Sequence, residues 1–207
     1  AFERRVKLKS IAIPASVTEI GNYAFSGCKG LESVTVEKEN KVYHSAENCL
    51  IETASKTLIF GCKNSTIPSD GSVTSINAYA FSGCDGLTSI TLPSSVTSIG
   101  DSAFANCVGL TSLTIPNGVT SIENSAFAFC TGLKSLTIAD SVKSIDSYAF
   151  GNCSSLETIT FKGTEEQWNA IKKAYNWASG PYTLVFAPPL PASKGLEFSL
   201  NNDKKSY

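Results

Sequence analysis

The segment LTSLTIPNGVTSIENSAFAFCTG, residues 110–132, is one copy of a unit that recurs along this chain every 23 residues. Leucine, cysteine and phenylalanine each return with that period, at Leu87, Leu110, Leu133 and Leu156, at Cys84, Cys107, Cys130 and Cys153, and at Phe81, Phe104, Phe127 and Phe150. A fixed period in this range is typical of a leucine-rich-repeat solenoid, whose turns bury apolar side chains only against neighbouring turns. We therefore expect an elongated stack of turns around one continuous core.

The unit also predicts the path of one turn. Residues 110–115 alternate between apolar and polar types, which indicates a short strand with Leu113 pointing into the core. Pro116 cannot donate a backbone hydrogen bond, so it ends the strand, and the Asn-Gly pair that follows favours a turn. Residues 125–127 are predicted to form a short helical or 3₁₀-like turn that places Phe127 in the core.

Residues 1–161 are therefore predicted to form a β-rich α/β solenoid, a right-handed leucine-rich-repeat superhelix of about six turns. Residues 1–7 match only part of a unit, so we expect the chain to be part of a longer protein. The irregular turn at 31–61 interrupts the period with an insertion at 37–61. We interpret this insertion as a β-hairpin with strands near 41–43, 49–51 and 57–60.

Residues 162–187 are predicted to be a C-terminal cap made of one helix and one strand. Thr164 and Gln167 have the spacing of a capping box, and three apolar residues share one helix face (Trp168, Ile171 and Tyr175). A solenoid needs its last turn covered, so we expect this helix to lie over the open end. Residues 188–207 are interpreted as a proline-rich linker followed by the start of a further module.

The composition argues against several classes of partner. The chain contains 17 Lys and Arg against 18 Asp and Glu, so it has no net positive charge to favour nucleic acid or an anionic membrane. No run of about 18 apolar residues could span a membrane. We expect a monomer that neither binds nucleic acid nor inserts into a membrane.

Seven cysteines and one histidine define the possible site chemistry. Five cysteines occupy one repeat position and are expected to be buried, reduced core residues (Cys28, Cys84, Cys107, Cys130 and Cys153). Cys49 and Cys62 fall outside that pattern and are the best candidates for a disulfide. No cysteines have the close spacing of a zinc site, and His44 would be the only histidine base for a catalytic triad. We therefore predict no metal, no cofactor and no catalytic residues.

Candidate binding residues lie on the outward side of the predicted strands and in the insertion. Two columns of small polar residues follow the strands; their clearest members are Ser89, Ser112 and Ser135 in one column and Thr91, Thr114 and Thr137 in the other. The concave sheet of a solenoid is its usual binding face, although Ser and Thr also suit a tightly stacked sheet for structural reasons alone. Tyr43 and His44 are the most distinctive residues of the insertion, which could also be a purely structural hairpin.

Residues 8–161 resemble the BspA-like class of leucine-rich repeats, through the motif I-P-x-x-V-x-x-I-x-x-x-A-F-x-x-C seen in LTSLTIPNGVTSIENSAFAFC. The resemblance implies a non-enzymatic, secreted or cell-surface bacterial protein of the adhesin type. Its partner would be a host or cell-surface protein, possibly a glycan, bound through the concave sheet and the 37–61 insertion. Two alternatives stay open: a carbohydrate-binding or cell-wall-associated accessory module of a larger enzyme, and a passive structural spacer.

Overall fold

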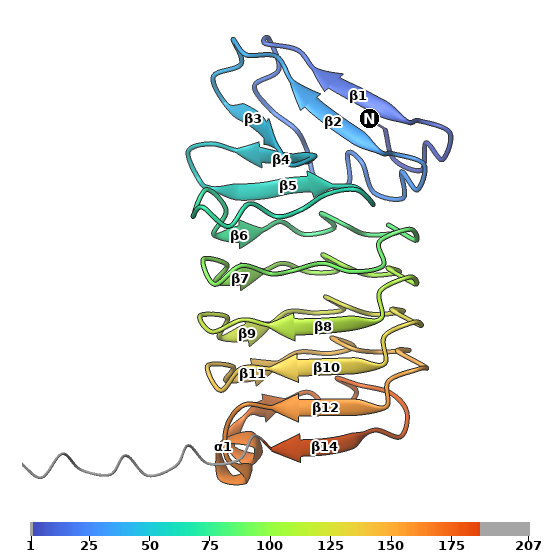
Figure 1. Ribbon diagram of the computed structural model, residues 1–207, viewed down its shortest axis with the longest axis vertical. Helices are drawn as coiled ribbons and strands as arrows, with labels where there is room; N and C mark the ends of the chain where they lie inside the picture. The colour runs from blue at the N-terminus through green and yellow to red at the C-terminus, as the bar shows by residue number, and fades with distance from the viewer. Residues whose placement is uncertain (1, 187–207) are drawn as a thin grey trace, which may run out of the picture.

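The computed structural model describes residues 2–186, which form a single stack of turns. Figure 1 shows the turns lying one above another, with the N-terminal strands at the top and the helix at the bottom. The stack is a β-solenoid of about eight turns. The sequence predicted about six, because residues 2–7 were counted as a fragment and residues 162–186 as a separate cap. The prediction for residues 188–207 lies outside the described residues.

The first side of the stack, the long-strand wall, consists of strands of four residues each. They are β1 (Ser10–Ile13), β2 (Ser33–Val36), β8 (Ser112–Ile115), β10 (Ser135–Ile138), β12 (Thr158–Phe161) and β14 (Thr183–Phe186). β1 pairs with β2, and β8, β10, β12 and β14 form one parallel sheet in sequence order. Each residue of β8 pairs with the residue 23 positions later in β10. Leu113 therefore lies beside Leu136, and the predicted inward residues meet in the core.

The second side, the short-strand wall, consists of strands of two residues. They are β6 (Ser75–Ile76), β7 (Ser98–Ile99), β9 (Ser121–Ile122), β11 (Ser144–Ile145) and β13 (Lys172–Lys173). β6 pairs in parallel with β7, and β9, β11 and β13 form a separate parallel sheet. The isoleucine of each of the first four strands is buried and faces the core.

The third side, the turn wall, contains residues 79–84, 102–107, 125–130 and 148–153. The predicted 3₁₀-like turn is wrong here, because Ser125 and Phe129 have φ angles of 54° and 60°, which no right-handed helix allows. Successive turns instead hydrogen-bond to each other: the Phe104 N–H donates to the Ala126 carbonyl at 2.8 Å, and the Phe127 N–H donates to the Ala149 carbonyl at 2.8 Å. In each turn of this wall, two left-handed residues four positions apart, such as Ser125 and Phe129, enclose three residues that have no positive φ angle.

Stacked phenylalanines and cysteines fill the core behind the turn wall. The rings of Phe81, Phe104, Phe127 and Phe150 lie in nearly parallel pairs with centroids 4.8, 5.2 and 5.2 Å apart. The Cys130 thiol donates to the Phe104 carbonyl at 3.2 Å, and the same bond recurs in the adjoining turns. The predicted burial of the five repeat cysteines is confirmed, and Cys49 and Cys62 are also free and buried.

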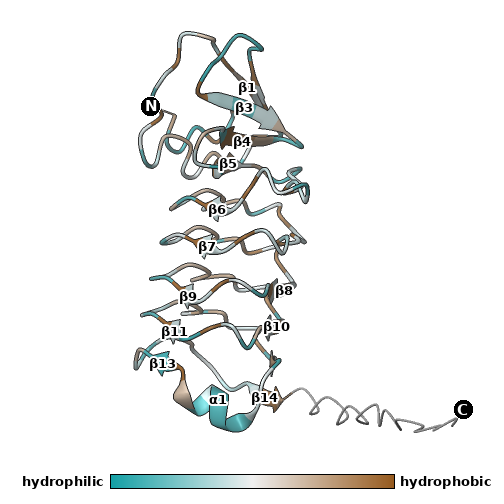
Figure 2. Cartoon of the chain, turned by 90° about the vertical axis from the view of Figure 1, so that its left-hand side faces the viewer, coloured by the Kyte–Doolittle hydropathy of each residue, from teal (hydrophilic) through white to brown (hydrophobic). Residues whose placement is uncertain are grey.

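The 37–61 insertion forms three antiparallel strands, β3 (Tyr43–Ala46), β4 (Cys49–Glu52) and β5 (Thr57–Gly61). β5 continues in parallel with β6, so the insertion joins the short-strand wall. Figures 1 and 2 both show these strands between β1 and the regular turns. Neighbouring β4 residues face opposite cores: Leu50 packs with the N-terminal cluster, whereas Ile51 packs with the main one. The insertion is therefore an internal partition rather than an exposed hairpin.

Because the inserted strands do not contribute to the turn wall, the turns on either side of them meet directly there. The Gly27 N–H donates to the Ser82 carbonyl at 3.2 Å, and the Lys29 ammonium lies 2.7 Å from the Asp85 carboxylate. The rings of Tyr23 and Tyr79 pack with centroids 4.1 Å apart. In the core behind this junction, the ring of Phe60 in β5 packs on the ring of Phe25, with the two centroids 4.8 Å apart.

The only helix among residues 2–186 is α1 (Glu165–Ala170), a six-residue helix whose Thr164 and Gln167 form the predicted capping box. Trp168 is buried against Phe161. The predicted apolar face fails at Tyr175, which lies beyond the helix and is fully exposed. The chain after α1 returns to both strand walls through β13 and β14, so the helix is one element of the last turn rather than a cap of its own. No helix in this part of the chain is long and apolar enough to cross a membrane.

Candidate functional site

The regular stacking is interrupted between the turn at 87–109 and the turn at 110–132, a boundary that we call the seam. Residues 88–92 form no strand, β8 is the first strand of its sheet, and β7 does not pair with β9. Within residues 2–186, one backbone hydrogen bond joins the strand walls of these two turns, from the Thr111 N–H to the Thr88 carbonyl at 3.4 Å. The turn wall stays fully bonded across the seam. Figure 1 shows the wider separation between β7 and the β8–β9 turn.

A cavity of about 430 Å³ lies along the seam on the long-strand wall. Its lining contains four of the predicted binding residues, Ser89, Thr91, Ser112 and Thr114, together with Ile90, Leu92 and Leu113. We call it the seam groove. All four hydroxyl side chains are exposed, whereas Leu92 and Leu113 form a buried floor. The groove therefore offers uncharged hydroxyl groups over an apolar base.

The β8 edge adds backbone groups to the seam groove. The Ser135 N–H donates to the carbonyl of Thr111 in the preceding turn, so the N–H of Ser112, which has the same register, points toward residue 88. An edge strand presents N–H and C=O groups that can pair with another extended segment. The remaining two predicted residues, Ser135 and Thr137, extend the hydroxyl columns onto β10, where the wall is shallow.

Hydrogen exchange should reveal the unpaired edge. We expect the amides of Ser112 and Thr114 to exchange at least roughly tenfold faster than those of Ser135 and Thr137, because only the second pair lies between two bonded strands. Amide exchange followed by NMR measures each position directly. Equal protection of the two pairs would show that the seam is closed in solution.

The structure does not bring Tyr43 and His44 to the seam groove. Tyr43 is 5% exposed, and its hydroxyl accepts a hydrogen bond from the Ile20 N–H at 3.0 Å. Its expected role as a contact residue is corrected: the ring is part of the N-terminal core and is not available to a partner. His44 is half-buried, with its Nδ1 2.8 Å from the Thr53 hydroxyl. Since the insertion is a partition, the buried apolar side chains of its strands pack into the two cores (Tyr43, Cys49, Leu50, Ile51, Leu58 and Phe60).

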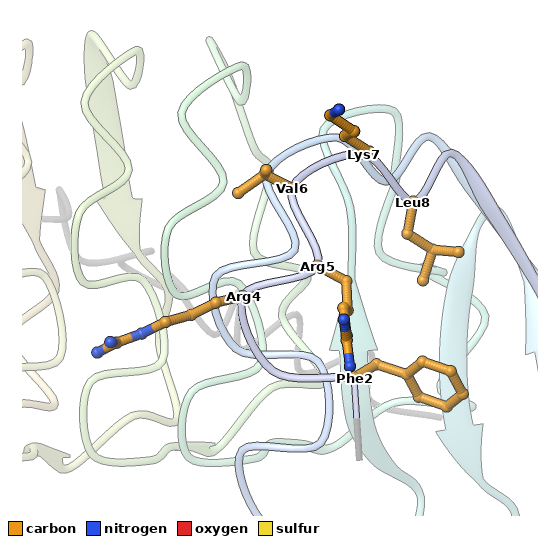
Figure 3. Close-up of a pocket in the computed structure, with 6 residues that line it drawn as sticks. All are labelled: Phe2, Arg4, Arg5, Val6, Lys7 and Leu8. Atoms are coloured by element: carbon orange, nitrogen blue, oxygen red, sulfur yellow. The ribbon is translucent and has the colours of Figure 1, made fainter.

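Two further cavities lie elsewhere. The larger, about 700 Å³, is at the N-terminal end of the stack and is lined by Phe2, Arg4, Arg5, Val6, Lys7 and Leu8. Figure 3 shows Phe2, Arg5 and Leu8 on one side of it and Arg4 extending the other way. The second, about 370 Å³, lies on β9, β11 and β13 and contains Glu123, Asp146 and Lys172. Neither contains a predicted site residue.

Burial raises the pKa of core thiols and also that of two tyrosine hydroxyls, Tyr43 and Tyr182. Burial raises the pKa of Cys49 and Cys84 to about 12 and that of Cys153 to about 11, and it raises the pKa of Cys107 and Cys130 as well. These thiols stay protonated at neutral pH and are poor nucleophiles. Residues 2–186 contain no group of three or more His, Cys, Asp or Glu side chains that could hold a metal ion.

Comparison with known families identifies the repeat. A model of the BspA type leucine rich repeat region matches residues 1–70 and 52–174, with six copies. The chain belongs to the BspA-type leucine-rich repeat family. The matched range extends past residue 161 into the helix-bearing last turn, in agreement with the pairing of β13 and β14 with the preceding turns.

Solved structures similar to this chain are bacterial proteins. A leucine rich cell surface protein of Faecalibacterium prausnitzii is 34% identical, with 84% of this chain and 52% of that one covered and a TM-score of 0.60. A leucine-rich repeat protein of Eubacterium ventriosum is 32% identical, with 75% and 43% covered and a TM-score of 0.68. The pneumococcal vaccine antigen PcpA, 23% identical with 86% and 50% covered and a TM-score of 0.61, shares the fold. No match was found among curated protein sequences.

The chain spans about half the length of the solved relatives that it matches. It is a leucine-rich repeat protein, and one of the solved proteins that it resembles is described as a cell surface protein. The residues that sequence reasoning did not single out are Ile90, Leu92 and Leu113, which form the floor of the seam groove. Nothing in the repeat pattern distinguished these positions, because the turn at 87–109 keeps the same residue types as its neighbours.

Proposed function

We propose that this BspA-type chain is a non-enzymatic protein-binding module of a secreted or cell-surface bacterial protein. Its partner is a host or cell-surface protein, held by the seam groove and by the long-strand wall beside it. The module acts outside the cell as a monomeric unit of an adhesin. The single observation that supports this proposal is the seam groove itself, in which exposed hydroxyls, an apolar floor and an unpaired strand edge occur together.

The chemistry of the groove suits an extended polypeptide. Ser89, Thr91, Ser112 and Thr114 can each donate and accept hydrogen bonds, and the edge of β8 can pair with a partner's main chain. Protein-binding surfaces are depleted of charge at their centre, and the lining of this groove contains no charged side chain. The description of one relative as a cell surface protein supports the extracellular setting.

Two bulky charges on the wall should abolish binding. We expect the full chain to bind at least one member of a panel of purified host extracellular and surface proteins on a biosensor. We expect Thr114→Arg with Ser135→Arg to weaken that binding at least tenfold, since both residues are exposed on the wall. The matched control is Ser98→Arg with Thr120→Arg, two exposed positions of the short-strand side, and it should bind like the wild type.

Three outcomes would contradict the proposal. An equal loss of binding in both double variants would show that the long-strand wall is not the binding site. Binding only to sugars on a parallel glycan array would favour the alternative of a carbohydrate-binding accessory module. A folded chain that binds no protein and no sugar would favour a passive spacer.

A further inference from the structure

A second surface of this chain has an unusual composition, and it lies on the turn wall rather than on the long-strand wall. Four successive turns contribute residues 102–109, 124–132, 147–155 and 175–179, which contain no Asp, Glu, Lys, Arg or His. The exposed groups in these segments are Val108, the rings of Phe129, Tyr148 and Tyr175, and a set of amides and hydroxyls (Asn106, Asn124, Thr131, Asn152 and Ser154). We call this surface the aromatic patch.

Phe129 occupies a position that its backbone disfavours. The equivalent residues of the other turns are Gly27, Gly83, Asn106 and Asn152, together with Arg4 in the first turn, and all of them have positive φ angles. Glycine and asparagine tolerate that conformation, whereas a bulky residue such as phenylalanine rarely adopts it. Phe129 has a φ of 60° and is nevertheless 48% exposed, so its ring is not needed to fill the core. A side chain that is disfavoured by its backbone and only half-buried points to a function outside the fold.

Tyr148 belongs to the turn that follows the turn of Phe129, and its ring lies close to a glycine. A Cβ at Gly151 would lie 3.1 Å from both the Cβ and the Cδ1 of Tyr148, so the glycine leaves room for the ring. The equivalent positions elsewhere are Ser82, Ala105 and Ala128. The Phe129 N–H donates to the Gly151 carbonyl at 2.7 Å, which fixes the two aromatic residues on neighbouring rungs of one ladder.

The last turn extends the patch. The Tyr148 N–H donates to the Asn176 carbonyl at 3.1 Å, so the fully exposed Tyr175 belongs to the next rung. Within residues 2–186 the rings of Phe129, Tyr148 and Tyr175 pair with no other aromatic ring. By contrast, Tyr23 and Tyr79 pack on each other at the other end of the turn wall, close to the Lys29–Asp85 ion pair. The aromatic patch is thus unpaired, uncharged and confined to the C-terminal half.

We propose that the aromatic patch is a binding site for a neutral glycan. Exposed aromatic rings stack on the apolar C–H faces of sugar rings, and side-chain amides and hydroxyls exchange hydrogen bonds with sugar hydroxyls. A charged patch would attract acidic sugars or oppositely charged protein surfaces, and these segments contain no charge. The turns repeat at the 5.2 Å spacing of the phenylalanine stack, close to the length of one sugar unit in an extended chain. This site is separate from the seam groove and does not depend on the function proposed for it.

The repeat supplies variants that remove the rings without harming the fold. Phe129→Asn installs the residue found at Asn106 and Asn152, and Tyr148→Ser installs the residue found at Ser102 and Ser125. Because the backbone favours these replacements, the double variant should melt at the wild-type temperature or above. Tyr23→Ser is the matched control, since it is the same change at the same position of the turn wall outside the patch.

Titration calorimetry of the full chain with four neutral hexasaccharides tests the site: β-1,4-glucan, β-1,3-glucan, α-1,4-glucan and β-1,4-mannan. We expect at least one to bind, each single patch variant to weaken binding about tenfold, and Tyr23→Ser to leave it unchanged. Absence of heat with all four sugars at millimolar concentration would overturn the proposal, as would unchanged binding by a folded double variant. If the wild type binds no sugar and the double variant loses binding to a protein partner, the aromatic patch is a protein-binding surface and not a glycan site.

Discussion

Raising the pH from 8 to 11 should unfold this protein through its buried thiols. Burial raises the pKa of six thiols above the ordinary value of 9.0, Cys28 among them, and the other five belong to the main core: Cys49, Cys84, Cys107, Cys130 and Cys153. Above pH 9 the unfolded chain releases these protons while the folded chain retains them. The folded state then binds more protons, so its stability is complete below pH 9 and falls as the pH rises toward about 11 to 12.

The expected slope is steep because the thiols act together. Each thiol that is ionised only in the unfolded chain costs about 1.4 kcal/mol of stability per pH unit, so five cost roughly 7 kcal/mol per pH unit. A typical folding free energy of about 5–15 kcal/mol would therefore be lost within about two pH units above 9. Urea unfolding midpoints measured at half-unit steps from pH 7 to 10.5, under argon with a phosphine reductant, would give this slope.

A cysteine variant separates the thiols from the other groups that ionise in the same range. Cys130→Ala should reduce the slope by about 1.4 kcal/mol per pH unit, whatever it does to the stability at pH 7. A slope that is the same in wild type and variant would mean that tyrosines and lysines, not thiols, cause the alkaline loss. A folding free energy that stays constant from pH 8 to pH 10 would contradict the expectation altogether.

Phe127→Ala should destabilise the protein by about 3–5 kcal/mol, the usual cost of a large cavity in a well-packed core. Phe127 is fully buried, and its ring stacks between Phe104 and Phe150 with centroids 5.2 Å away on each side. The loss therefore reaches both neighbouring turns, because Phe104 and Phe150 each lose one of their two aromatic neighbours and keep only Phe81 and Trp177. Equilibrium denaturation measured by circular dichroism reports the change.

Phe129→Asn is the control for Phe127→Ala, because it removes the same type of side chain two residues later in the same turn. Phe129 is half exposed and has a left-handed backbone, so its removal should cost nothing measurable. Comparable losses in the two variants would show that the stacked phenylalanines have no special part in stability. An unchanged midpoint for Phe127→Ala would mean that the turns close over the cavity.

The period by itself predicted which residues fill the core. Leu113, Val119, Ile122, Phe127 and Cys130 are all buried, as their positions in the unit required. This prediction succeeded because equivalent positions of successive turns have the same surroundings, so the same positions are apolar in each repeat. The capping box of α1 was also predictable from the sequence, since it depends on two residues three positions apart.

Other features depend on contacts that the pattern does not encode. The insertion reads locally as a hairpin, but only the stack shows that apolar turns cover both of its faces and that Tyr43 is buried. The left-handed positions of the turn wall contain serine, asparagine, tyrosine and phenylalanine as well as glycine, so the residue types gave no warning of the conformation. Four of the eight predicted binding residues were brought together by the seam, which the sequence does not reveal.

The sequence alone determined the repeat, its inward side chains, the buried cysteines and the BspA-type family, because these follow from spacing along the chain. Only the tertiary structure decided where the stack is interrupted, which face of the insertion is accessible and which aromatic side chains remain exposed. Those properties depend on how one turn lies against the next. In a solenoid each turn meets only its neighbours, so a change in stacking at one boundary creates a surface feature without any change in the repeat.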